Sequence, residues 1–170
     1  MYGFKTLTTE NWLQPDTASV PFVKLSHSDG TVSRMSAEDW LSFFLDPTLS
    51  KSVPENVHTL FEVARGSLAY GYFFCPLYTL ACEQLFRTAE AAVSEKCELL
   101  VAPKGVKTFK DKVQFLMERQ VISAEQFSDW DGVRMFRNLT SHPERQKILP
   151  PGAVATLLFG ISEAINELFA

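Results

Sequence analysis

The chain lacks any apolar run long enough to cross a membrane. Its longest apolar stretch, from about Tyr70 to Cys82, is interrupted by Pro76, whereas a membrane-spanning helix needs about 20 consecutive apolar residues. Residues 1–15 also lack the apolar core that a signal peptide carries. We therefore expect no membrane association and a cytoplasmic location.

The chain also lacks an excess of positive charge. Its 16 basic and 20 acidic residues give a net charge of −4, so no global positive field attracts nucleic acid. Any contact with RNA must come from a local basic patch. Cysteine is scarce as well: Cys75, Cys82 and Cys97 lie on apolar, helix-like segments. An odd number of cysteines on apolar helical segments predicts reduced thiols. We expect each of them to act as a small buried apolar side chain.

Several motifs of catalysis and cofactor binding are missing. There is no Gly-x4-Gly-Lys-Ser/Thr or Gly-x-Gly-x2-Gly phosphate loop and no Gly-x-Ser-x-Gly nucleophile turn. The cysteine spacing, with no histidine nearby, does not fit a zinc site. Asp129 and Asp131 place two carboxylates close together. Such pairs are more often surface charges of a helix than a catalytic acid and base. We expect neither a cofactor nor a metal ion.

A regular helical spacing of apolar residues is present from Ser52 to the C-terminus. Potential N-terminal caps occur at Ser52, Thr108 and Ser123, and breaks occur at Gly71–Pro76 and at residues 148–152. These signals predict helices over about 52–72 and 77–100, a third that opens at 108, a fourth over 123–141 and a fifth after 152. The expected fold is all-α, an up-and-down bundle of four to five helices.

The sequence predicts a separate N-terminal extension over the first fifty residues, followed by a helical domain over residues 51–170. Segments 22–25 and 31–35 flank Asp29-Gly30 and predict a β-hairpin. Because a lone hairpin is marginal in water, we expect it to lie against the helical body or another subunit. A short helix over 37–45, capped by Ser36 and Asp39, should bury Trp40, Phe43 and Phe44.

The helix predicted over 123–141 ends in a small polar cluster. Its apolar stripe of Phe127, Trp130, Val133 and Phe136 recurs at three-residue steps. Arg137 is four residues beyond Val133 and therefore falls on the same stripe. Since a buried arginine rarely lacks a partner, this position is the first sign of a site.

His142 should lie at the end of this helix, because it precedes Pro143 and a proline disfavours the α conformation for the residue before it. The negative end of the helix dipole favours the protonated imidazole there, and a histidine of this kind titrates near neutral pH. Two interpretations of the cluster remain open. Arg137 and His142 form a functional pair, or His142 is a C-cap that pairs with Glu144 while Arg137 pairs with Asp131 or another neighbour.

The motif Arg137-Asn138-x3-His142 and the order of the helices resemble the HEPN superfamily of small α-helical domains. In that superfamily an arginine, a polar residue and a histidine stand at the end of the penultimate core helix. The resemblance extends from about Ser52 to Ala170, and the first fifty residues have no counterpart in it. It implies a HEPN-like bundle with Arg137, Asn138 and His142 as the catalytic residues.

The resemblance implies a metal-independent endoribonuclease, of the kind found among toxins and defence ribonucleases, that cleaves single-stranded RNA. His142 would transfer a proton, and Arg137 would stabilise charge on the phosphate. Arg134, Arg145 and Lys147 would add an RNA-binding rim. Lys104, Lys107, Lys110 and Lys112 are either a solvated face or an extension of that rim.

A single cluster offers only one proton carrier, so a two-fold homodimer that brings two copies of His142 to one cleft is expected. Trp130, Phe136 and the segment Tyr70–Phe74 are candidates for its interface. The alternative is a non-catalytic HEPN-like module that binds a nucleotide, RNA or a protein, such as an antitoxin or a component of a defence system. Pro143 favours this alternative if it holds the imidazole away from Arg137.

Overall fold

The structure, a computed structural model, describes residues 4–19, 22–26, 28–140 and 149–170. Within these ranges the chain forms six helices and one two-stranded antiparallel sheet. The all-α expectation with a small N-terminal hairpin is thus confirmed, whereas the HEPN-like arrangement of the bundle stays a prediction. The elements are β1 (Val23–Leu25), β2 (Val32–Arg34), α1 (Ala37–Leu45), α2 (Glu55–Tyr70), α3 (Leu77–Leu99), α4 (Phe109–Glu118), α5 (Ala124–Thr140) and α6 (Pro151–Leu168).

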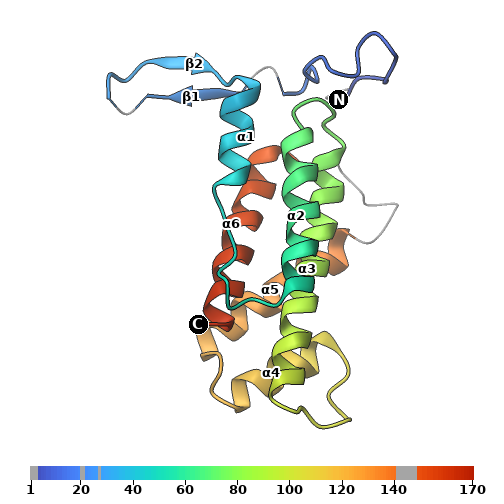
Figure 1. The fold of residues 1–170 in the computed structure, drawn as a ribbon, viewed down its shortest axis with the longest axis vertical. Helices are drawn as coiled ribbons and strands as arrows, with labels where there is room; N and C mark the ends of the chain where they lie inside the picture. The colour runs from blue at the N-terminus through green and yellow to red at the C-terminus, as the bar shows by residue number, and fades with distance from the viewer. Residues whose placement is uncertain (1–3, 20–21, 27, 141–148) are drawn as a thin grey trace.

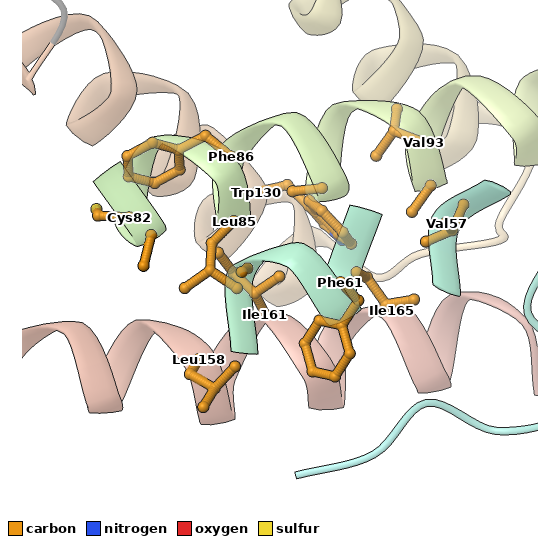
Figure 2. Close-up of a cluster of buried hydrophobic side chains, with 14 of the residues drawn as sticks. Val57, Phe61, Cys82, Leu85, Phe86, Val93, Trp130, Leu158, Ile161 and Ile165 are labelled. Atoms are coloured by element: carbon orange, nitrogen blue, oxygen red, sulfur yellow. The ribbon is translucent and has the colours of Figure 1, made fainter. Parts of the chain in front are cut away.

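Helix α3 is the centre of the fold, because it packs against α2, α4, α5 and α6. Figure 1 shows α2, α3 and α6 running along the long axis of the molecule, with α4 at one end. Phe61 of α2, Leu85 of α3 and Leu158 of α6 are all buried and meet in one hydrophobic core (Figure 2). No helix in the described part of the chain is long and apolar enough to cross a membrane.

The turn between α2 and α3 depends on a close approach between Gly71 and Tyr78. Tyr78 is fully buried, and a Cβ atom at Gly71 would overlap its ring, 2.7 Å from Cδ1 and Cζ. Gly71 has an ordinary helical φ of −55°, so the glycine is needed here for space and not for its backbone angles. The predicted helix break at Gly71–Pro76 is confirmed.

Three of the four predicted helix caps are present. Ser36, Thr108 and Ser123 each accept a hydrogen bond from the backbone N–H three residues later, at 3.1 to 3.2 Å, and the side chain at that later position bonds back in each case. The cap predicted at Ser52 is wrong. Pro54 occupies the N-cap position of α2, and no side chain caps that helix.

The hairpin forms in the predicted place, with Val23 opposite Arg34 and Leu25 opposite Val32. All six strand residues are exposed, although Phe22 and Met35 at the base of the hairpin pack against the core and Lys24 pairs with Asp39 of α1. Figure 1 shows the hairpin projecting sideways from the body next to α1. The hairpin thus contacts the helical body at its base, and a contact of its exposed face with another subunit stays a prediction.

Helix α1 buries two of the three aromatic residues expected to be buried. Trp40 and Phe44 are buried, but 42% of the surface of Phe43 is exposed. Trp40 and Phe44 are four residues apart and share one helix face, whereas Phe43 lies about 100° from Phe44. Phe43 therefore reaches only the edge of the core, where its ring contacts Phe159 at 5.6 Å between centroids.

Residues 4–19 are attached to the turn between α2 and α3 through Asp16. This carboxylate is fully buried and accepts hydrogen bonds from the backbone N–H of Cys75 at 3.1 Å and of Ala18 at 3.0 Å. Trp40 and Phe44 of α1 belong to the same core cluster as α2, α3 and α6. The assignment of residues 1–50 and 51–170 as two units stays a prediction.

Candidate functional site

Helix α5, which carries the predicted motif, is anchored to the body mainly through Trp130. Trp130 is 3% exposed, and its ring contacts Phe109 of α4 with 6.4 Å between centroids. Phe127 and Val133 are half-buried against the core. The predicted stripe is thus confirmed at these three positions, while the side chain of Phe136 lies outside the described residues. Buried in its own chain, Trp130 is not available for a dimer interface.

Arg137 is more exposed than its place on the stripe predicts. The exposed fraction of its side chain is 45%, and its guanidinium nitrogen lies 3.3 Å from a carboxylate oxygen of Glu90. It borders a small recess between α3, α4 and α5 that Phe86, Phe109 and Val133 also line. Its charged end reaches the partly exposed Glu90 of α3. The predicted burial of Arg137 is therefore wrong.

Arg134 is engaged by an acidic residue of its own helix. Its Nε donates a hydrogen bond of 2.6 Å to Asp131, and this bond lowers the pKa of the Asp131 carboxyl below its usual range. The alternative that paired Arg137 with Asp131 is wrong, because Arg134 is the partner of Asp131 and Glu90 is a partner of Arg137. The same interpretation also allowed an ion pair between Arg137 and another neighbour, and the pair with Glu90 confirms this part of it.

The remaining members of the predicted site lie beyond what the structure describes. The backbone of Asn138 belongs to α5, but its side chain is outside the described residues, and so are His142, Arg145 and Lys147. The roles assigned to these four residues, and the pairing of Arg137 with His142, stay predictions.

Glu90 and Phe109 are neighbours of Arg137 that no pattern in the sequence indicated. They come from α3 and α4, far from the motif along the chain, and only tertiary packing brings them to it. One of the lysines near the start of α4 also lies close to α5. Lys110 is exposed and helps to lower the pKa of Asp131 through its charge. Lys110 thus lies near α5, while an extension of the RNA-binding rim onto α4 stays a prediction.

The three cysteines have no disulfide partner and are buried, as predicted. Burial raises the pKa of the Cys82 thiol to about 12 and also raises the pKa of the Cys75 and Cys97 thiols. These thiols are therefore protonated and unreactive at neutral pH. Among the described residues, no group of three or more His, Cys, Asp or Glu side chains is placed to hold a metal ion.

No protein-family model, no curated protein and no solved structure matches this chain.

Proposed function

We propose that the protein is a metal-independent endoribonuclease of the HEPN type that cleaves single-stranded RNA at the C-terminal end of α5. The observation that carries the proposal is the position of Arg137. Its guanidinium is half-exposed and is held at the helix end by Glu90, while its neighbours in the sequence supply the rest of the Arg-Asn-x3-His motif. A charged, accessible and oriented guanidinium is suited to bind a phosphate group.

The chemistry needs no group beyond those of RNA and of two copies of the motif. The ribose 2′-oxygen attacks the adjacent phosphorus, the bond from phosphorus to the 5′-oxygen of the next nucleotide breaks, and the products are a 2′,3′-cyclic phosphate and a 5′-hydroxyl. One copy of His142 takes the proton from the 2′-hydroxyl, and the His142 of the second copy gives a proton to the leaving 5′-oxygen. Arg137 stabilises the negative charge that develops on the phosphate oxygens. Asn138 orients the phosphate.

A second function is favoured by one specific contact, the ion pair between Arg137 and Glu90. A carboxylate at 3.3 Å partly neutralises the guanidinium, as expected if Arg137 serves to join α5 to α3. In this case the chain is a non-catalytic helical module that binds a nucleotide, RNA or a protein such as an antitoxin or a defence-system component.

The catalytic function, by contrast, needs a second proton carrier. A two-fold homodimer with two copies of His142 in one cleft supplies it.

The two functions are separated by an RNA cleavage assay in excess chelator. His142→Ala and Arg137→Ala should each abolish cleavage. Because Arg137 is half-exposed, its replacement should change the free energy of unfolding by less than about 1 kcal/mol. Arg134→Ala, Arg145→Ala and Lys147→Ala should weaken RNA binding and reduce its salt dependence without removing the chemistry.

Lys51→Ala is the matched control, because Lys51 is an exposed cation in the connector before α2 and its loss should leave cleavage unchanged. Cleavage that survives both His142→Ala and Arg137→Ala, or that needs added metal, would place the site elsewhere. A protein that cuts no RNA at all would support the binding module.

A further inference from the structure

The projecting hairpin presents an apolar face to solvent. Val23, Leu25 and Val32 are 55%, 57% and 64% exposed. Residues directly opposite each other in an antiparallel pair, and residues two apart on one strand, lie on the same face. The register therefore places these three residues together with Arg34 on one face of the hairpin.

Contacts at its base hold this hairpin in a fixed position. The ring of Phe22 packs on Trp40 with 5.3 Å between centroids, and the Met35 N–H donates a hydrogen bond of 3.1 Å to the Phe22 carbonyl. Lys24, on the other face, forms an ion pair of 2.6 Å with Asp39 at the start of α1. The apolar face is thus preorganised, and preorganisation lowers the entropy cost of binding a partner.

A groove between α5 and α6 has properties complementary to those of the hairpin face. It has a volume of about 570 Å³, and Val133, Leu157 and Ile161 contribute apolar surface to it. Gly132 and Gly160 line the two sides of the groove. A Cβ atom at either glycine would meet nothing within 4 Å, so these positions leave open space that side chains of a partner can fill.

Three carboxylates, of Asp129, Glu163 and Glu167, lie in this groove, and no lysine or arginine is among the described residues that line it. Such a surface repels RNA phosphates. It attracts a partner that combines apolar side chains with a cation, as the hairpin face does with Arg34. A groove-to-groove contact between two copies would instead place like charges together, which is unfavourable.

The hairpin cannot reach the groove of its own chain. Figure 1 shows the hairpin near the end of the body where α2 turns into α3, while the C-terminal end of α6 lies toward the opposite end. The groove is lined by the first half of α5 and by α6 from Thr156 to Glu167. A second copy in the opposite orientation brings its hairpin to this end, and two-fold symmetry makes the exchange reciprocal and closed.

We propose that the β1–β2 hairpin of one copy docks in the α5–α6 groove of a second copy and that the exchange is mutual. Val23, Leu25 and Val32 enter the open space beside the two glycines, and Arg34 faces the carboxylates. The proposal uses surfaces other than the Arg137 end of α5. A wild-type monomer would contradict both this dimer and the dimeric site of the proposed function, whereas a dimer that the hairpin and groove substitutions do not weaken would overturn the docking alone.

The self-association of the full chain tests this proposal by light scattering and sedimentation. The wild type should be a dimer at micromolar concentration. Leu25→Glu, which places a charge on the docking face, and Gly160→Leu, which fills the groove, should each raise the dimer dissociation constant by at least about tenfold. Ser33→Glu is the matched control, because Ser33 is on the other face of the hairpin, and it should leave the constant unchanged.

Both substitutions lie at exposed positions, so folding should be retained, and circular dichroism verifies this. A wild-type monomer at these concentrations would overturn the proposal. So would a dimer that neither Leu25→Glu nor Gly160→Leu weakens.

Cross-linking then locates the contact. Val32→Cys can be labelled selectively with a benzophenone maleimide, because the three native thiols are buried. In a mixture of ¹⁴N and ¹⁵N protein, irradiation should join this label to residues 126–133 or 156–167 of the other copy. Label at Ser33→Cys should give far fewer such products. Cross-links from Val32→Cys that reach only its own chain, or another surface of the second copy, would overturn the proposal.

Discussion

Helices α3 and α5 are held in the molecule in different ways. Helix α3 buries eleven residues between Tyr78 and Cys97 and packs on four other helices. Among the described side chains of α5, by contrast, only Trp130 is buried. The helix that carries the candidate site thus depends on one main anchor, and its Arg137 end is held by an ion pair at the surface. The site can therefore change without loss of the core, whereas a change in the core should destabilise the whole fold.

The largest effect is expected at that anchor. Trp130→Ala removes the ring that packs between α5 and α4, and replacing a buried tryptophan costs about 4 kcal/mol. The loss should be local, so amide hydrogen exchange should become faster in α5 while the amides of α3 stay protected. Met135→Ala, at a position of the same helix that is 62% exposed, is the control and should change little. Equal loss of protection in α3 and α5 would remove the contrast between the two helices.

A somewhat smaller but global effect is expected in α3. Leu85 is fully buried among residues of α2 and α6 (Figure 2), and Leu85→Ala should lower the free energy of unfolding by about 3 kcal/mol. Urea denaturation measures this loss as a lower midpoint with an unchanged slope. Leu80→Ala, on the same helix but 52% exposed, should cost less than about 0.5 kcal/mol. Similar losses for the two variants would mean that α3 is not the centre of the core.

The smallest effect on stability is expected at Glu90. Glu90→Gln removes an exposed ion pair and should change the free energy of unfolding by less than about 1 kcal/mol. It also removes a negative charge 3.3 Å from Arg137, so single-stranded RNA should bind more tightly. Glu98→Gln is the control, because it removes the same charge from the same helix at an exposed position. Unchanged RNA affinity in Glu90→Gln would argue that Arg137 does not contact phosphate.

Local signals in the sequence predicted much of the fold. The caps at Ser36, Thr108 and Ser123 involve residues only three apart, so a short pattern specifies them. The same reasoning failed at Ser52, because Pro54 fixes the start of α2 without a side-chain cap. The hairpin was also predicted from its Asp29-Gly30 turn, since Gly30 adopts the positive φ of 70° that such a turn needs.

The surroundings of the candidate site could not be predicted in this way. The position of Arg137 on the stripe follows from helical spacing, but its exposure depends on which part of α3 lies opposite. That part carries Glu90, and the packing of α3 against α5 is a tertiary contact without a local pattern. The exposure of the apolar face of the hairpin could not be predicted either. The turn sequence predicts the two strands, but it does not show which part of the molecule, if any, covers them.

The chemical nature of the RNA ends after cleavage tests the central claim most directly. A defined single-stranded RNA is incubated with the protein in excess chelator, and mass spectrometry identifies the new ends. The Arg137/His142 site predicts 2′,3′-cyclic phosphate and 5′-hydroxyl ends, which should be absent with His142→Ala. Cleavage that leaves 5′-phosphate ends, or that occurs only after magnesium is added, would contradict this account.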